Sequence, residues 1–270
     1  MHLSIILPTI NERDNLKDLI PALYSTFNNF IEIEIVVVDD GSTDGTATLM
    51  KEFQKTFKRL VFLERVVCDG LPGAISAGIS KAEGELIAWL DADGSMPIPV
   101  LFEMYLEFNK KKLDVIIGSR FVKNGGFKGL NVKGKTTFLQ FLDNLKRSQD
   151  SPIAVILSRM LNVFLRLILN AGVRDITSGF ILTKKNLVEK ENLVGRYGEY
   201  FPVLIRCLAQ KNLRIQEYGY VCLPRNFGIS KTGNSLHQYL NRGIPYIYFS
   251  FKKLAEDLIL KFRAILRRKI

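Results

Sequence analysis

The sequence predicts an α/β protein built on a mainly parallel sheet with helices on both faces, and three observations favour this fold class. Short apolar runs of strand type alternate with segments of helical spacing through the first 120 residues, as in successive βαβ units. The run at 35–38 is continuously apolar, which is typical of a strand buried on both faces. Two runs end in aspartates, at 39–40 and at 91 and 93, where parallel sheets bind their ligands.

The first half of the chain divides into alternating strands and helices. Strand-type runs cover residues 3–7, 31–40, 60–65, 85–93 and 113–120, and helical spacing covers 11–27, 46–57, 71–82 and 100–109. In the first helix Leu16, Leu19 and Leu23 fall on one face. Asn11 is expected to be the N-cap of that helix, because asparagine is favoured there.

The pattern changes after Arg120. Residues 121–152 are rich in Gly, Lys and Asn, and they predict a long mobile loop of the kind that often serves function. A helix at 153–171, the segment TSGFILTKK, a helix at 200–210 and a strand-type run at 213–223 follow. No linker or repeat interrupts the chain, so we expect one catalytic domain over residues 1–235 and a basic amphipathic, membrane-associating tail over 236–270.

The charge balance indicates an anionic partner. The 270 residues carry a net charge of +11, which suits phosphates, an acidic membrane surface or nucleic acid. Nucleic-acid binding is the remote alternative, because no RNP-type strand, zinc-finger spacing or helix-turn-helix pattern is present. With two histidines in the chain, a zinc site or a histidine-based catalytic pair is not expected.

The remaining composition bears on localisation. Three separated cysteines, at 68, 207 and 222, are expected to be free thiols in a reducing compartment. No signal peptide is evident, and no apolar stretch reaches the ~20 residues of a spanning helix. We therefore expect a peripheral protein at the cytoplasmic face of a membrane, without a transmembrane segment.

The two aspartate pairs are the first candidates for chemistry. Asp91 and Asp93 lie in an extended segment and point the same way, because side chains alternate along a strand. Together they can hold a hard cation such as Mg²⁺, or one can hold the cation while the other contacts a sugar. Asp39 and Asp40 can accept hydrogen bonds from a nucleobase or a ribose. The alternative for that segment is a turn and helix cap made with Ser42 or Asp44.

Several motifs together resemble family 2 glycosyltransferases of the GT-A fold, the nucleotide-diphospho-sugar transferase fold. The first half carries LPTINE, VVVDDGSTDGT, GLPGAISAGISKAEGE and DADGSMP. In the second half, VIIGSR, LSRMLNVFLRLILNAGVRDITSGF and PRNFGISK are similar to dolichyl-phosphate mannose or glucose synthases and their polyprenyl-phosphate relatives. The resemblance runs from about residue 3 to residue 231.

The resemblance implies a role for each matching residue. The nucleotide would be bound by Pro8, Thr9, Asn11, Glu12, Asp39, Asp40 and Gly70. Mg²⁺ or Mn²⁺ would be bound with the sugar-nucleotide diphosphate by Asp91 and Asp93, which with Arg120 and Arg225 form the catalytic set. The acceptor phosphate would be contacted by Arg120 and Ser158, while Arg225 and Lys231 would reach the diphosphate or the acceptor side.

Two positions depart from the pattern of the relatives. After the DxD motif the relatives usually carry Leu-Gln-His, whose glutamine serves the metal, and this chain has Gly94, Ser95 and Met96 instead. Ser95 or water is therefore expected to complete the coordination. The relatives also place an arginine four residues before the serine matched by Ser158; Ala154 stands there, and Arg147 is expected to substitute.

The implied reaction moves a hexose, mannose or glucose, from a nucleoside diphosphate to dolichyl or polyprenyl phosphate with inversion at C1. A phosphate acceptor is already an anion and needs no general base, whereas a hydroxyl acceptor usually needs one. Transfer to a carbohydrate hydroxyl is the alternative, with Glu199 or Asp175 as the base. The GSR and SGF segments favour the phosphate acceptor.

Two segments indicate where the lipid could be met. In the helix at 153–171 the polar residues Arg159, Asn162, Arg166 and Asn170 recur at helical steps. This stripe fits an interfacial helix and a core helix with one solvated edge equally well. The tail carries an apolar stripe of Phe251, Leu254, Leu258, Phe262 and Ile265, with seven basic residues at other positions, which favours contact with an anionic membrane.

Overall fold

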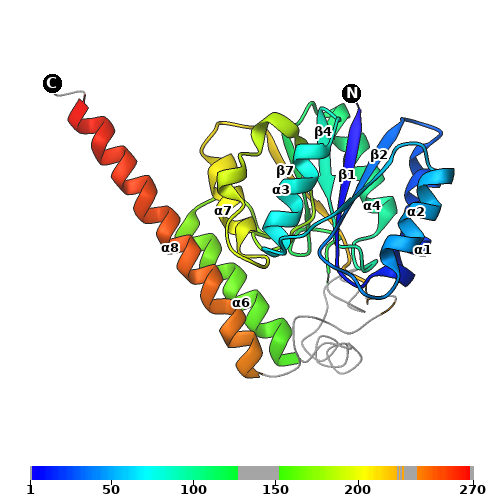
Figure 1. Cartoon of the computed structure of the whole chain (residues 1–270). Helices are drawn as coiled ribbons and strands as arrows, with labels where there is room; N and C mark the ends of the chain where they lie inside the picture. The colour runs from blue at the N-terminus through cyan, green and yellow to red at the C-terminus, as the bar shows by residue number, and fades with distance from the viewer. Residues whose placement is uncertain (1, 127–151, 224, 226, 228–235, 268–270) are drawn as a thin grey trace.

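The computed structural model describes residues 2–126, 152–223, 225, 227 and 236–267. Its centre is a seven-stranded sheet in the order β3-β2-β1-β4-β6-β5-β7, drawn in Figure 1 with helices on both sides. All neighbouring strands pair in parallel except β6, which is antiparallel to both β4 and β5. The predicted fold class, an α/β protein with a mainly parallel sheet, is confirmed.

The elements follow the predicted order, with ends that shift by a few residues. The strands are β1 Leu3–Thr9, β2 Ile33–Asp39, β3 Leu60–Glu64, β4 Leu86–Trp89, β5 Val115–Ser119, β6 Ile181–Lys184 and β7 Ile215–Gly219. The helices are α1 Arg13–Phe27, α2 Thr46–Thr56, α3 Leu71–Lys81, α4 Ile98–Lys110, α6 Pro152–Leu169, α7 Tyr200–Ala209 and α8 Leu236–Arg267. Two 3₁₀ turns, η1 Lys185–Leu187 and η2 Lys190–Asn192, lie between β6 and α7.

The sheet separates two hydrophobic cores, because its central strands are apolar on both faces. One core packs α1, α2 and α4 against the sheet, with Phe27 and Met104 fully buried. The other packs α3, α6 and α7 against the opposite face, with Trp89 and Phe201 inside. Burial of this many apolar side chains is the main source of stability in such a fold.

The start of α1 differs from the prediction. Asn11 is not the N-cap: it adopts a left-handed backbone conformation with φ 52°, and its side-chain oxygen accepts the N–H of Thr43 at 2.8 Å. The first N–H of the helix, at Arg13, donates instead to Asp44 at 2.9 Å. Asp44 also accepts the N–H of Thr46, so one carboxylate caps both α1 and α2 across two loops.

The predicted loop at 121–152 is described only in its first residues and its last. Residues 127–151, which include Arg147, lie outside the described part of the chain, as does Lys231. The described start of the loop is held to the sheet, because Gly126 forms an isolated bridge with Val221 beyond β7. Gly126 therefore lies at the same edge where β5 and β7 end.

Helices α6 and α8 lie side by side at the border of the domain, and α8 extends past the sheet layers toward the C-terminus (Figure 1). Part of α8 reverses the usual amphipathic pattern. Ser250 and Asp257 of α8 are buried, while Phe251, Leu258 and Phe262 are more than half exposed. No described helix combines the length and the apolar character that crossing a membrane requires.

The predicted polar stripe on α6 is only partly present. Asn162 lies inside the protein, where its amide donates to the carbonyl of Arg174 and its oxygen accepts the N–H of Ile176. Arg159 and Arg166 are exposed, and so are the large apolar side chains of α6, namely Ile156, Met160, Val163, Phe164 and Leu167. Large apolar side chains of α6 are thus exposed, as are those of α8.

We predict that Asp257→Asn loosens the attachment of α8 to α7. Asp257 accepts hydrogen bonds from Arg206 at 3.1 Å, Gln210 at 2.6 Å and Lys253 at 2.9 Å. Burial opposes its ionisation, but the Lys253, Arg206 and Gln210 hydrogen bonds outweigh it and lower the Asp257 pKa. The substitution is expected to cost about 1–3 kcal/mol, measured by thermal unfolding at pH 7.

The pH dependence checks the cause of that loss. Because the folded pKa lies below the unfolded value of about 4, the stabilisation is complete above that value and disappears as the pH falls through the folded pKa. The difference in melting temperature between wild type and Asp257→Asn should stay constant from pH 7 to 5 and shrink below pH 4. A difference that is constant down to pH 3 would contradict the ionic origin.

Candidate active site

A cavity of about 610 Å³ opens beyond the carboxyl ends of β1, β2 and β4. Eight of the residues predicted for the site line it together: Pro8, Thr9, Glu12, Asp40, Gly70, Asp91, Asp93 and Arg225. Ile10, Cys68, Leu71, Ala74, Ala92, Arg196 and Tyr197 complete the wall. The edge of the sheet at which the sequence placed the ligand is thus the edge at which the cavity lies.

Two carboxylates pair with one arginine in this cavity. The Arg225 Nε lies 3.0 Å from an oxygen of Asp93, and its Nη1 lies 3.5 Å from an oxygen of Glu12. Glu12 and Asp93 are both buried, and the second oxygen of Asp93 accepts the N–H of Ser95 at 2.9 Å. Arg225 is therefore the internal counter-ion of a strongly acidic group.

Asp91 is a third carboxylate that lines this cavity, beside Glu12 and Asp93. It is exposed there, yet desolvation by the surrounding protein and the neighbouring Asp93 carboxylate raise its pKa to about 7. Arg225 and Arg120 act in the opposite direction, and Glu12 adds to the rise. A further cation at this position would be favoured by the local field.

The residues present fit a hard divalent cation such as Mg²⁺ or Mn²⁺. Asp91 and Asp93 supply carboxylate oxygens from the segment after β4, which turns at residues 92–93 and does not continue the predicted extended strand. Arg225 already provides a positive charge beside Asp93. Within the described chain no three Asp, Glu, His or Cys residues are arranged to hold an ion by themselves. Mg²⁺ sites commonly combine one or two carboxylates with substrate phosphates and water, so this arrangement suits a metal that arrives with a diphosphate.

Ser95 lies beneath the cavity and not in its wall. It is buried, its N–H supports Asp93, and its carbonyl accepts the N–H of Leu223 at 2.9 Å. Its backbone thus ties the DxD segment to the chain that leads into Arg225. A direct bond from the Ser95 hydroxyl to a metal remains a prediction.

Asp39 and Asp40 have different surroundings. Asp39 is buried, and its two oxygens accept the N–H and the hydroxyl of Ser42, so it shapes the turn after β2. Asp40 lines the cavity and pairs with Arg65 at 3.1 Å. Burial raises the pKa of Asp40, and Arg65 acts against that rise. Of the two, Asp40 is the carboxylate that a ligand in the cavity can reach.

A turn that sequence reasoning missed closes the other wall of the cavity. Arg196 and Tyr197 lie in it, and buried Glu199 holds the turn by accepting their backbone N–H groups at 2.7 and 3.1 Å. Gly70, with φ +95°, sits so close that a Cβ there would be 2.3 Å from the Arg196 carbonyl oxygen. The signal in the sequence was GRYGEY, in which two glycines flank an Arg-Tyr pair.

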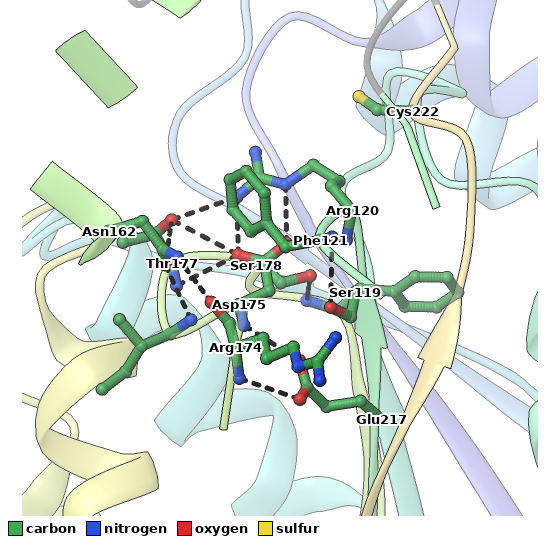
Figure 2. Close-up of polar contacts among 12 residues, drawn as sticks. Ser119, Arg120, Phe121, Asn162, Arg174, Asp175, Thr177, Ser178, Glu217 and Cys222 are labelled. Carbon is green, nitrogen blue, oxygen red and sulfur yellow. Dashed lines mark hydrogen bonds and ion pairs between the residues drawn. The ribbon is translucent and has the colours of Figure 1, made fainter. Parts of the chain in front are cut away.

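Arg120 lies at the end of β5 in a buried network that Figure 2 shows. Its Nε and Nη2 each lie 2.8 Å from an oxygen of Asp175, and its backbone N–H donates to the same carboxylate at 2.9 Å. Burial alone would lower the Arg120 pKa, but the Asp175 charge and hydrogen bonds raise it well above its usual value. Figure 2 also shows Glu217 accepting the N–H groups of Arg174 and Asp175.

The remaining predicted residues lie elsewhere or outside the described chain. Asn11 is exposed and bonds to the turn after β2, and it is not among the lining residues. Ser158 is half-buried on α6, away from that lining. Arg147 and Lys231 fall in the segments that the structure does not describe. The acceptor roles of Ser158, Arg147, Lys231 and Arg120 therefore remain predictions.

Comparison with known proteins identifies the family. Residues 4–190 match the model of Glycosyl transferase family 2. The chain is similar to a dolichol-phosphate mannosyltransferase of Pyrococcus furiosus, with 29% identity over 98% of this chain and 68% of the relative. It is also similar to a polyprenol monophosphomannose synthase of Mycolicibacterium smegmatis, with 27% identity over 86% of this chain and 81% of the relative.

Solved structures agree on the fold. A glucosyl-3-phosphoglycerate synthase from Mycobacterium tuberculosis, in complex with Mn²⁺, UDP and phosphoglyceric acid, gives a TM-score of 0.62 at 15% identity and covers 93% of this chain and 78% of that one. A mannosyltransferase from Pyrobaculum calidifontis, in complex with GDP-Man and Mn²⁺, gives 0.58 at 17% identity, with coverages of 94% and 64%. The chain belongs to glycosyltransferase family 2, has the GT-A fold and is a glycosyltransferase.

We predict that Asp175→Asn destabilises the fold strongly, because it leaves the Arg120 charge buried without its partner. Asp175 is completely buried and Arg120 nearly so, and removing one member of such a pair typically costs about 3–5 kcal/mol. Urea unfolding at pH 7 measures the loss. Asp14→Asn is the matched control, since it breaks an exposed ion pair of 3.3 Å with Arg13 and should cost about 1 kcal/mol or less. Equal losses in the two variants would contradict the account.

Proposed function

We propose that the protein is a metal-dependent, inverting hexosyltransferase that moves a sugar from a nucleoside diphosphate to dolichyl or polyprenyl phosphate. Mannose is proposed ahead of glucose, because the names of both curated relatives refer to mannose. The observation that carries the proposal is the acidic group of Glu12, Asp91 and Asp93 around Arg225, at the strand ends of a family 2 glycosyltransferase.

The donor side follows from the arrangement of charges. Asp40 can accept hydrogen bonds from the nucleoside, and Pro8, Thr9 and Gly70 present backbone and small surfaces next to it. Asp91 and Asp93 would hold Mg²⁺ or Mn²⁺ with the diphosphate. When bound, such an ion acts as a Lewis acid that stabilises the departing diphosphate. Arg225, released in part from Asp93, is then available to the same anionic oxygens.

The hydrogen bonds of Asp175 and Glu199, the two candidate general bases, bear on the choice of acceptor. Asp175 accepts the Arg120 guanidinium with both oxygens and is fully buried. Glu199 accepts two backbone N–H groups and is also buried. Neither carboxylate is placed to take a proton from an acceptor hydroxyl, which disfavours the alternative of transfer to a carbohydrate. A lipid phosphate, which attacks as an anion, needs no such base.

Catalysis on this proposal is positioning plus electrostatics. The two reacting partners are both anions, so the protein must bring them together against their repulsion. Arg225 beside the DxD segment supplies positive charge in the cavity, and arginine forks match phosphate oxygens in pairs. Arg120 at the end of β5 is proposed as a second positive charge for the acceptor, in addition to its pairing with Asp175. In-line attack by the phosphate oxygen forms the new bond at C1 while the bond from C1 to the diphosphate breaks, which inverts the centre.

The outward apolar surface of α6 and α8 supports the membrane part of the proposal. Large side chains that are exposed on both helices form it, among them Met160, Phe164, Leu167, Phe251, Leu258 and Phe262. Soluble proteins rarely leave so many large apolar groups in water on one surface. A lipid surface would cover them, and it would hold the polyprenyl chain of the acceptor beside the cavity. Peripheral attachment at the cytoplasmic face is accordingly proposed.

A donor and acceptor screen tests the function. Radiolabelled GDP-mannose, UDP-glucose or UDP-GlcNAc is incubated with Mn²⁺ and either dolichyl phosphate in micelles or an oligosaccharide. We expect label from GDP-mannose in the lipid product and loss of turnover on adding EDTA. Label in the oligosaccharide alone would favour the hydroxyl-acceptor alternative, and salt-sensitive DNA binding without sugar transfer would favour the nucleic-acid alternative.

Asp93→Asn tests the metal assignment within that screen. Replacing one carboxylate oxygen with an amide removes a metal ligand and is expected to lower kcat by on the order of a hundredfold or more. The fold should be retained, which far-ultraviolet circular dichroism checks. Asp14→Asn, far from the cavity lining, should keep full activity. Full activity in Asp93→Asn would remove the DxD assignment.

Vesicle binding tests the membrane surface. The double variant Leu258→Asn/Phe262→Asn removes two exposed apolar side chains from α8, each worth about 2 kcal/mol when buried. Co-sedimentation with vesicles containing anionic lipid should fall more than tenfold. Phe30→Asn/Leu106→Asn is the matched control, because it removes two exposed apolar side chains on the other side of the sheet. Undiminished sedimentation of the α8 variant would exclude this surface.

A further inference from the structure

We propose that Arg196 is a donor-binding residue whose guanidinium pairs with the diphosphate of the sugar nucleotide. The inference rests on the proposed function, because it assumes that the cavity takes a nucleoside diphosphate. Arg196 lines the same cavity as Asp91 and Arg225, although it lies more than 100 residues further along the chain than Asp91. Four features of the turn around it lead to this assignment.

The backbone at Arg196 is fixed from three sides. Its N–H donates to buried Glu199 at 2.7 Å, and its carbonyl accepts the N–H of Leu71, the first residue of α3, at 2.9 Å. Gly70 lies so close to this carbonyl that any Cβ would meet it at 2.3 Å. A side chain mounted on a fixed backbone loses less freedom on binding a ligand.

The conformations of two glycines make this close approach possible. Gly70 and Gly195 both have positive φ, of +95° and +92°, which favours glycine over other residues. At Gly195 a Cβ would lie 2.4 Å from the Glu199 side chain. The turn is therefore constrained by its own carboxylate and by the start of α3, and both constraints meet at Arg196.

The charge of Arg196 is uncommitted, unlike that of the other arginines near the cavity. Arg225 pairs with Asp93 and Glu12, and Arg65 pairs with Asp40. Across the described residues no carboxylate lies within ion-pair distance of the Arg196 side chain, which is exposed. An arginine presented to a cavity without an internal partner is suited to an anion from outside.

The wall that carries Arg196 also favours negative charge. Gly70 and Leu71 mark the N-terminal end of α3, an 11-residue helix, and helix N-termini favour negative charge. The Leu71 N–H donates to the Arg196 carbonyl, and the Asp69 carboxylate lies against Gly73 in the first turn. Carboxylates from β1, β2 and β4 line the opposite part of the cavity and would repel a diphosphate unless a metal intervened. Arg196 thus supplies positive charge on the side of the diphosphate that the metal does not face.

Equilibrium titrations with nucleotides of increasing charge test the assignment. Guanosine, GMP and GDP, and the matching uridine series, are titrated in the presence of Mn²⁺ into wild type, Arg196→Ala and Arg196→Lys, with binding measured by calorimetry. Removal of a charged hydrogen-bonding partner is expected to weaken diphosphate binding by about 10- to 100-fold. The nucleoside should bind equally to all three proteins, and the lysine variant should fall between the other two.

Two further variants separate the guanidinium from general effects. Arg214→Ala removes the same charge at the opposite edge of the sheet, before β7, and should bind GDP within about twofold of wild type. Glu199→Gln keeps Arg196 but removes one acceptor from its turn, so an intermediate loss of diphosphate affinity is expected. Thermal unfolding of each variant shows whether it is folded at the titration temperature.

The outcomes distinguish this inference from the proposed function. A selective loss of diphosphate affinity in Arg196→Ala supports the assignment. Unchanged GDP and UDP affinity in that variant, or an equal loss for the nucleosides, overturns it while leaving the proposed function in place. Absence of diphosphate binding in the wild type overturns the proposed function and the assignment with it.

Discussion

The repulsion between carboxylates gathered at one edge of the sheet is the constraint on which the site depends. Parallel strands end together, so Glu12, Asp91 and Asp93 are brought within reach of one another. Burial and, after it, the neighbouring Asp93 carboxylate raise the pKa of Asp91, and Arg225 acts against that rise. A group with this surplus charge is stable only next to cations, whether arginine or metal. The fold therefore favours the binding of a cation at this edge of the sheet.

Around this centre, the other charges are neutralised internally. Asp40 pairs with Arg65, and Asp175 pairs with Arg120. The carboxylate oxygens of Glu199 and Glu217 accept hydrogen bonds from backbone N–H groups. These buried bonds position loops from β2, β5 and β7 without adding to the surplus. Because such networks are costly to leave half-satisfied, they restrict the loops to one arrangement. Rigid cavity walls, together with a centre that carries excess negative charge, are what a preorganised cation site requires.

The sequence was sufficient for the parts that depend on local pattern. Apolar runs that end in aspartates predicted both the sheet and the edge at which Asp91 and Asp93 meet, since strand type and strand end are local properties. It was insufficient where a contact joins distant segments: nothing near Arg196 indicates that its turn closes against α3. Asn162 was assigned to a solvated stripe because helical spacing records which residues share a face, and it does not record which face is buried. The start of α1 was misjudged for a related reason, since its capping carboxylate comes from another loop.

The antiparallel strand β6 has a consequence for how the chain is made. It is inserted between β4 and β5, so residues up to 120 complete four strands on one side and leave an open ladder on both β4 and β5. During synthesis these hydrogen-bonding edges have no partner until residue 184 has left the ribosome. Unpaired strand edges invite association with other chains. A nascent polypeptide of this kind is exposed to misassembly from the completion of β4 at residue 89 until β6 is complete at residue 184.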